Sequence, residues 1–247
     1  IDIDLQEYGE LLMQNKLGAI VAIEPSTGEI LSFISSPTYD PNQLIGRIRG
    51  NNYSKLLNDP LKPLINRAFS EQPPGSTFKL VQALIAQQEG VINPSTTFGC
   101  SMGYHAGGLT VGCHSHASPL NLLQSVQQSC NSYYCNVFRK TIDNRKKYKT
   151  TEEGYQVWKD YLAGLGFGVT LGIDLPSEKD GNIPPTTYYD KYYGRNHWNS
   201  LTIISLAIGQ GEVLATPLQL ANEAAYIANR GYYYKPHLVS AIGTPDN

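Results

Sequence analysis

The sequence predicts a mixed α/β fold, because it combines one hairpin of two strands with several amphipathic helices. Residues 19–24 and 29–35 are the expected strands, and residues 25–28, Pro-Ser-Thr-Gly, supply the turn between them. The chain has 247 residues, of which 41% are hydrophobic, and this is enough to bury a substantial core. The sequence contains no internal repeat and no low-complexity linker, so we expect one domain over residues 1–247.

The predicted helices share apolar residues at helical spacing and end at recognisable caps. Asp4 and Glu7 have the spacing of a capping box at the start of the first helix. Thr216 and Gln219 repeat that signature for the last helix, which has Pro217 at its first position. The helices are expected at residues 5–15, 77–89, 120–128, 133–142 and 216–231.

The remaining segments lack a clear period and are predicted to be irregular. Residues 37–63 are polar and punctuated by Asn and Pro, so we expect irregular surface there. Residues 94–118 favour a loop or small insertion, residues 144–151 a charged surface link, and residues 175–200 a long loop.

Charge and hydropathy exclude some classes of partner. The net charge is −2 and no basic run of the kind that follows a phosphate backbone is apparent, so we expect no nucleic acid. No stretch approaches the roughly 18–20 apolar residues of a membrane span, and the chain does not open on a signal peptide. We therefore expect a fragment whose targeting segment lies upstream.

Residues 73–79, Pro-Pro-Gly-Ser-Thr-Phe-Lys, contain the only Ser-x-x-Lys of the chain. Three residues separate Ser76 from Lys79, so the two side chains would share one face at the start of a helix. A serine hydroxyl needs a base, and a lysine can serve if burial lowers its pKa. The helix N-terminus also offers N–H groups to a developing oxyanion. The alternative is that Ser76 caps the helix and Lys79 is a solvated surface residue.

Residues 129–131, Ser-Cys-Asn, form the only Ser-x-Asn of the chain and lie between two predicted helices. The Ser129 hydroxyl could relay a proton from Lys79 to a leaving amine, and the Asn131 carboxamide could hold the lysine and a substrate amide. The alternative is that Ser129 or Asn131 only caps the helix that follows.

The two motifs together resemble those of the penicillin-recognising serine acyltransferases. Two longer segments narrow this resemblance to the transpeptidase domain of class B, elongation-type penicillin-binding proteins (penicillin-binding protein 2). The segments are GAIVAIEPSTGEILSFISSPTYDPN, from Gly18, and SLAIGQGEVLATPLQLANEAAYIANRGYYYKPHLV, from Ser205. The resemblance extends from about Ile3 to Val239 and implies an antiparallel sheet flanked by helices, with the Ser76 helix buried at its centre.

The resemblance also implies a function. Ser76 would be the acylated serine of a peptidoglycan D,D-transpeptidase, Lys79 its general base, and Ser129 and Asn131 the residues of the second motif. The enzyme would cross-link stem peptides during cell-wall elongation, maintain cell shape and react with β-lactams. It would act at the periplasmic face of the inner membrane, anchored by an N-terminal segment, together with a membrane glycan polymerase.

One family feature is absent from the sequence. The third motif, Lys-Thr/Ser-Gly on a strand edge, does not occur before the chain ends at Asn247. The resemblance therefore implies that the later strands, one oxyanion donor and the contacts to the substrate carboxylate are missing from these residues. Two alternatives of the same fold remain open: a β-lactamase, which would release hydrolysed drug rapidly, and a β-lactam sensor or non-catalytic scaffold.

Cysteine and histidine residues cluster between the two motifs. Cys100, Cys113, His116 and Cys130 have the spacing Cys-x12-Cys-x2-His-x13-Cys, and zinc accepts a set of three thiolates and one imidazole. Some relatives of penicillin-binding protein 2 hold zinc beside the Ser-x-Asn turn, which favours a structural Zn²⁺ with these four ligands. Disulfides and free thiols are the alternatives, since the family works in an oxidising compartment. His114 is the alternative ligand, and Cys135 is expected to be a small buried side chain.

Overall fold

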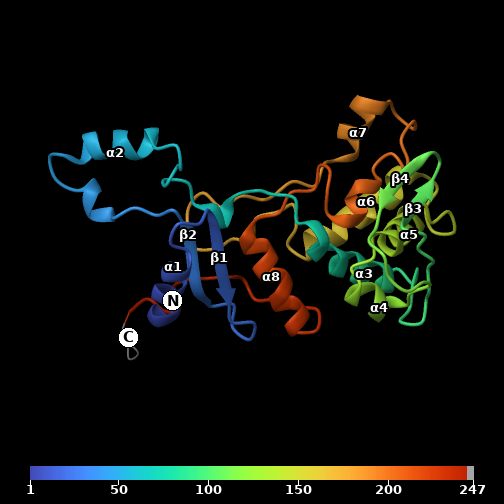
Figure 1. Cartoon of the computed structure of the whole chain (residues 1–247), viewed down its shortest axis with the longest axis horizontal. Helices are drawn as coiled ribbons and strands as arrows, with labels where there is room; N and C mark the ends of the chain where they lie inside the picture. Colours follow the sequence, from blue (N-terminus) through green and yellow to red (C-terminus); the bar gives the residue numbers. More distant parts are fainter. Residues whose placement is uncertain (244–247) are drawn as a thin grey trace. The chain divides into compact units, whose positions relative to one another are not determined.

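The computed structural model describes residues 1–243, which form two compact units (Figure 1). Unit 1 comprises Ile1–Glu71, Val169–Asp180 and the described residues from Thr216 onward, and unit 2 comprises Gln72–Gly168 and Gly181–Ala215. The expectation of one domain, incomplete at its C-terminus, stays a prediction. Among the described residues, none of the helices combines the length and apolar character that crossing a membrane requires.

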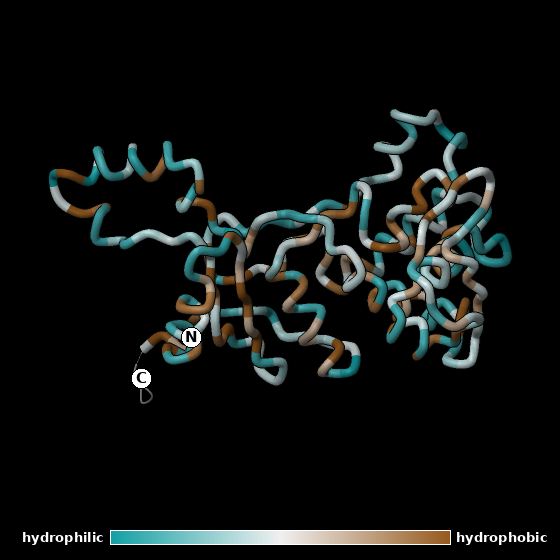
Figure 2. Tube along the Cα trace, in the orientation of Figure 1, coloured by the Kyte–Doolittle hydropathy of each residue, from teal (hydrophilic) through white to brown (hydrophobic). Residues whose placement is uncertain are grey.

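Unit 1 is built on the predicted hairpin. Strands β1 (Gly18–Ile23) and β2 (Ile30–Ser36) pair antiparallel, from Gly18 opposite Ser36 to Ile23 opposite Ile30, with a register shift after Ala22. Alternate residues of β2 are buried, as the two-residue period of a strand requires. Figure 2 shows hydrophobic residues along both strands. The predicted strands are confirmed to within one residue at each end.

Helix α1 (Ile3–Leu12) packs against β2 and helix α8 (Pro217–Ala228) against β1. The capping box predicted for α8 is confirmed, since Thr216 and Gln219 exchange two hydrogen bonds of 3.0 and 3.2 Å. The box predicted at Asp4 is wrong, because the Asp2 carboxylate accepts from Leu5 N–H and α1 begins two residues earlier. The hydrophobic core of this unit includes Ile30, Phe69, Leu171, Ile173 and Leu218.

The region predicted to be irregular surface, residues 37–63, contains a helix. After the short 3-10 turn η1 (Pro41–Leu44), helix α2 (Arg49–Asn58) forms, and none of its residues is buried. Tyr53, Leu56 and Leu57 have helical spacing, but the glycine and asparagines of this segment obscured the pattern. A second 3-10 turn, η2 (Arg67–Phe69), leads toward the end of the first segment of unit 1.

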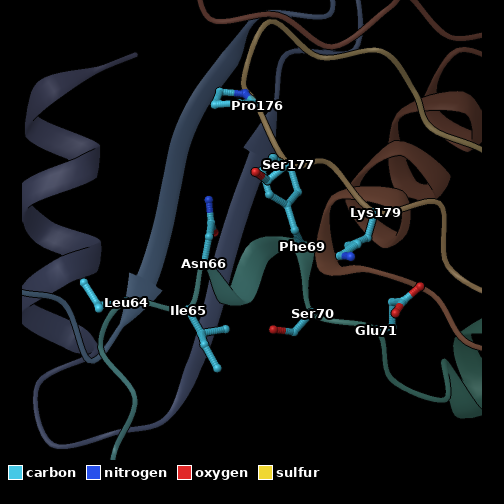
Figure 3. A pocket seen from close by; sticks show the side chains of 9 residues that line it. All are labelled: Leu64, Ile65, Asn66, Phe69, Ser70, Glu71, Pro176, Ser177 and Lys179. Atoms are coloured by element: carbon cyan, nitrogen blue, oxygen red, sulfur yellow. The ribbon is translucent and has the colours of Figure 1, made fainter. Parts of the chain in front are cut away.

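Unit 1 also contains a hollow of about 590 Å³. Its walls are the nine side chains labelled in Figure 3, from residues 64–71 and 176–179. None of the residues predicted for the catalytic or metal site contributes to it.

Unit 2 is mainly helical. Three of its helices were predicted: α3 (Phe78–Gln88), α4 (Leu122–Gln127) and α5 (Asn131–Ile142). Helix α6 (Thr151–Gly164) had been assigned to no element, although Tyr155, Trp158 and Leu162 mark its buried face. Helix α7 (Thr186–Tyr193) lies in the predicted long loop, and strands β3 (Gly103–Ala106) and β4 (Leu109–Gly112) form a hairpin in the predicted insertion.

Aromatic side chains fill the centre of unit 2. Phe78 of α3 packs edge-on against Trp158 of α6 and against Phe167, with ring centroids 6.2 and 5.5 Å apart. Phe138 of α5 meets Trp158 from another side, at 5.3 Å. Because Phe78 and Lys79 are adjacent, burying this aromatic side chain fixes the first turn of the helix that carries the predicted base.

Candidate active site

Ser76 lies in a 3-10 turn, η3 (Gly75–Thr77), that leads directly into α3. Gly75 adopts φ +62°, and the Thr77 hydroxyl donates to Pro74 O at 2.9 Å, which closes the turn. The Ser76 side chain is exposed, and its hydroxyl makes no hydrogen bond within the described residues. The turn therefore presents an unengaged hydroxyl at the N-terminus of a buried helix.

Lys79 is almost fully buried, with 3% of its surface exposed, and its ammonium group reaches the second motif. Nζ donates to Ser129 O at 2.7 Å, Ser129 Oγ at 3.0 Å and Asn131 Oδ1 at 2.6 Å. It also lies 5.8 Å from the ring centroid of Tyr134. Burial lowers the pKa of Lys79, and the neighbouring thiols of Cys113, Cys130 and Cys135 oppose this change. The structure thus joins Lys79 to both polar residues of Ser-x-Asn.

The Ser-x-Asn motif occupies the break between α4 and α5. Ser129 is in the left-handed region, at φ +47°, and its N–H donates to Val126 O at 3.0 Å. The N-cap of α5 is Cys130, whose sulfur accepts from Tyr133 N–H at 3.4 Å. The alternative in which Ser129 or Asn131 caps the helix is therefore wrong, and both side chains are available to Lys79.

Asn131 is held from the side of the β3–β4 hairpin. Its Nδ2 donates to the Gly112 carbonyl at 2.8 Å, and its backbone N–H donates to Cys113 Sγ at 3.4 Å. With Nδ2 committed to a carbonyl, Oδ1 is the atom that faces Lys79. The contacts of Gly112 with Asn131 and of Tyr134 with Lys79 leave no local sequence signal, because both join residues that are remote along the chain.

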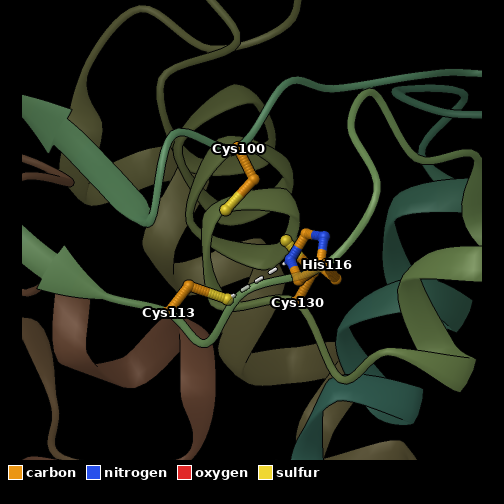
Figure 4. Close-up of side chains that lie close together, drawn as sticks. All are labelled: Cys100, Cys113, His116 and Cys130. Carbon is orange, nitrogen blue, oxygen red and sulfur yellow. Dashed lines mark hydrogen bonds between the residues drawn. The ribbon is translucent and has the colours of Figure 1, made fainter.

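The four predicted metal ligands lie together (Figure 4). The sulfur atoms of Cys100, Cys113 and Cys130 and a ring nitrogen of His116 are all within 4.8 Å of one another. His116 Nδ1 lies 2.7 Å from Ala117 O, which leaves Nε2 to face Cys113 Sγ at 3.5 Å. Tetrahedral zinc with bonds of about 2.0–2.3 Å would require ligand atoms roughly 3.3–3.8 Å apart, so this donor set fits after a small contraction.

Cys135 and His114 lie outside this group of four ligands. All four cysteines belong to the described residues and are free. Cys135 is completely buried, as predicted. His114 stacks on His116 with ring centroids 5.3 Å apart.

The thiols have very different acidities. Burial raises the pKa of Cys113, but hydrogen bonds from the backbone N–H of Asn131 and from His116 outweigh it and bring the pKa to about 7. Burial raises the pKa of Cys130 to about 12, and the thiols of Cys113 and Cys100 add to this effect. Because each thiolate opposes ionisation of the next, a bound cation is the natural way to hold all three as thiolates.

The fold and the arrangement of Ser76, Lys79, Ser129 and Asn131 can be compared with known protein families. The model for the penicillin binding protein transpeptidase domain matches residues 18–245. The chain therefore belongs to the penicillin-binding protein transpeptidase family, with the mixed α/β fold that its sequence predicted.

Particular relatives narrow the comparison. Peptidoglycan D,D-transpeptidase MrdA of Escherichia coli K12 is 31% identical over 244 residues, which are 97% of this chain and 36% of that protein. MrdA of Haemophilus influenzae is 33% identical over 248 residues, covering 98% of this chain and 36% of that protein. The chain thus spans about a third of the length of these curated relatives.

Solved structures of penicillin-binding proteins have the same fold as this chain. PBP2 of Pseudomonas aeruginosa, crystallised in complex with WCK 5153, superposes with a TM-score of 0.84 at 30% identity, over 97% of this chain and 53% of that one. PBP2 of Helicobacter pylori gives a TM-score of 0.83 at 28% identity, over 96% of this chain and 43% of that one. The expected resemblance to penicillin-binding protein 2 is confirmed.

Proposed function

We propose that this chain supplies the acylating site of a peptidoglycan D,D-transpeptidase that works in cell-wall elongation. The observation that carries this function is the set of three hydrogen bonds from Lys79 to Ser129 and Asn131, one helical turn from the exposed Ser76. The MrdA relatives, named as D,D-transpeptidases, support the reaction class.

In the proposed reaction, Ser76 Oγ attacks the carbonyl carbon of the penultimate D-Ala of a stem peptide and passes its proton to neutral Lys79. The terminal D-Ala leaves as an amine, after receiving a proton through the Ser129 hydroxyl. An amine on a neighbouring strand then attacks the ester on Ser76 and loses a proton to the same relay. This step forms the cross-link and restores the serine.

Two features of the site support these roles. Burial of Lys79 lowers its pKa, which increases the fraction of neutral amine able to accept a proton. Asn131, fixed by the Gly112 carbonyl, holds the amine against Ser129 and so keeps the relay short.

Mass spectrometry after exposure to penicillin tests the acyl-enzyme. The full-length protein should gain the mass of one drug molecule on Ser76, and the adduct should hydrolyse very slowly. Ser76→Ala should abolish it, whereas Ser70→Ala, which changes another serine on the approach to the motif, should retain it. Rapid release of hydrolysed drug would identify a β-lactamase instead, and no adduct on the full-length wild type would refute the function.

The second part of the proposal is a structural Zn²⁺ held by Cys100, Cys113, His116 and Cys130. Four protein ligands leave no open position, so the ion would supply no chemistry to the reacting bond. Its ligands would instead fix the turn of Ser129 and Asn131, because Cys130 caps α5 and Cys113 accepts from Asn131 N–H. Zinc would thereby stabilise the residues that hold Lys79.

A metal assay tests this site. The purified protein should contain one equivalent of zinc, and Cys113→Ala should lose it. Cys135→Ala is the matched control, because Cys135 is a buried cysteine outside the group, and it should retain zinc. Zinc well below one equivalent in the wild type would contradict the proposal.

We further propose that the protein works at the periplasmic side of the inner membrane, together with a membrane glycan polymerase. Two structural relatives support this: one belongs to a peptidoglycan synthase complex that coordinates polymerization and crosslinking, and the other is PBP2 of Helicobacter pylori in complex with MreC. Co-purification of the full-length protein with a glycan polymerase from membranes tests this, and its absence would count against the partner.

A further inference from the structure

The turn that carries Ser76 is supported by a glycine far along the chain. Gly209 follows the 3-10 turn η4 (Ile204–Ile208), and its carbonyl accepts from Gly75 N–H at 2.8 Å. The same two segments also pair at Gln72 and Ala215, which exchange backbone hydrogen bonds of 2.9 and 2.8 Å. The approach to Ser76 is therefore held along its length by residues 209–215.

Only glycine fits at position 209. Its φ is +67°, and a Cβ there would lie 2.3 Å from Gly75 O, 2.7 Å from Phe78 Cβ and 2.9 Å from Gly75 N. These neighbours are backbone atoms or a Cβ, so none can rotate away as the end of a flexible side chain could. Any side chain at 209 would have to displace the turn that precedes Ser76.

The segment that contacts Gly75 is also hydrogen-bonded to α3, the helix that carries Lys79. Gln82, which is 2% exposed and belongs to α3, donates through Nε2 to Leu206 O of η4 at 3.1 Å. Its Oε1 accepts from Trp158 Nε1 at 2.9 Å. Gln82 thus joins two elements, which we call the α3–η4 frame: α3 carries Lys79, and Gly209 at the end of η4 contacts Gly75.

The position of Ser76 depends on the α3–η4 frame. Its own hydroxyl makes no hydrogen bond within the described residues, so no hydrogen bond of the side chain fixes it. A Cβ at Gly75 would meet nothing within 4 Å, so the turn is not packed where that side chain would point. The hydrogen bond to Gly209 is then a constraint from outside the turn that holds the serine relative to Lys79.

We propose that Gly209 is a positioning residue for Ser76, which sets the register of the nucleophile against its base. This inference rests on the proposed acyl-transfer function. A displacement of about 1 Å at a reacting group can cost on the order of a hundredfold in rate. Gly209 would therefore affect the covalent step and leave the initial binding of the drug largely unchanged.

The chain offers a matched control. Gly90, just beyond the end of α3, also has φ +67°, but a Cβ there would meet nothing within 4 Å. Gly209→Ala and Gly90→Ala therefore share the cost of a left-handed alanine, and only Gly209→Ala adds a collision with the turn.

The test follows acylation of the full-length protein by a fluorescent penicillin over a series of concentrations. We expect Gly209→Ala to lower the limiting first-order acylation rate about a hundredfold, and the half-saturating concentration to change less than about threefold. Gly90→Ala should leave both values within about threefold of the wild type, although it lowers the unfolding temperature. Equal acylation rates in the two variants would overturn the positioning role.

A second variant covers the case in which Gly209→Ala does not fold. Gln82→Met removes the hydrogen bond that ties η4, and so Gly209, to α3, together with the acceptor of Trp158 Nε1, and adds no atom beside Gly75. We expect a limiting acylation rate about tenfold lower at an unchanged half-saturating concentration. A rate equal to that of the wild type would refute the inference. A wild type that reacts with no penicillin would refute the proposed function itself, so the two failures are distinguishable.

Discussion

Two buried ionisable side chains, Lys79 in unit 2 and Glu223 in unit 1, have opposite surroundings. Lys79 is 3% exposed and donates to three oxygen atoms. Glu223, in α8, is 2% exposed, and neither of its carboxylate oxygens has a hydrogen-bond partner within the described residues. Burial favours the neutral form of both: it lowers the pKa of Lys79 and raises the pKa of Glu223 to about 8.

The difference shows that a perturbed pKa alone does not mark a catalytic group. Glu223 has a strongly shifted pKa, yet its carboxylate oxygens have no hydrogen-bond partner within the described residues. Lys79, one helical turn after Ser76, combines its shift with acceptors that hold the amine against the Ser129 hydroxyl. Four substitutions test this contrast.

The largest effect is expected at Lys79. Lys79→Met retains the length of the side chain and removes the amine, so acylation of Ser76 by penicillin should slow by about 10²–10⁴-fold, the range for loss of a general base. Stopped-flow acylation measures this, and far-UV circular dichroism checks that the fold persists. Acylation at the wild-type rate would show that Lys79 is not the base.

The next effect concerns stability at Glu223. Its pKa is about 8 in the folded chain and 4.5 in the unfolded reference, so folding favours the protonated carboxyl. The stability that this preference gives to the folded chain is fully present below pH 4.5 and is lost as pH rises through 8. Glu223→Gln keeps the shape and cannot ionise, so it should raise the free energy of unfolding at pH 7 by about 3 kcal/mol at most. Denaturant titrations at pH 5 and pH 8 measure both proteins. A stability difference that does not grow with pH would contradict this account.

A smaller effect is expected if Lys79 is made to resemble Glu223 by removing one acceptor. Asn131→Ala leaves the ammonium with Ser129 alone and frees the Gly112 carbonyl. Loss of a hydrogen bond to a charged group costs about 1.5–3 kcal/mol of unfolding free energy. Asn136→Ala is the control, since Asn136 lies on the same helix and donates only to Ser132 O of its own turn. Equal losses in the two variants would show that Lys79 does not depend on Asn131.

The smallest effect is expected at Tyr226, one turn after Glu223. Its side chain is completely buried, and its hydroxyl has no hydrogen-bond partner within the described residues. Tyr226→Phe removes only that hydroxyl, so the free energy of unfolding should stay the same or rise by up to about 1 kcal/mol. Thermal unfolding measures it, and a loss of more than about 1 kcal/mol would reveal a hydrogen bond that this arrangement lacks.

The residues of the candidate site could be predicted from the sequence more completely than the secondary structure. Ser76, Lys79, Ser129 and Asn131 were named from two short motifs, and the structure places Lys79 against Ser129 and Asn131. Helix α2 was missed because glycine and asparagine residues weaken its local pattern, and β3 and β4 because four-residue strands show too short a period. The support from Gly209 depends on a backbone contact between distant segments, which no local pattern can reveal.

The backbone of Ser129 restricts which substitutions a lineage could accept at that position. Its φ of +47° is a conformation that glycine adopts freely and serine does not. A change to glycine would relieve the strain but remove the hydroxyl, and a change to alanine would keep the strain and still lose the hydroxyl. Threonine would keep the hydroxyl, but its β-branch makes the left-handed conformation more costly. For the proposed acylating enzyme, changes that slow acylation under drug selection are therefore more accessible around this residue than at it.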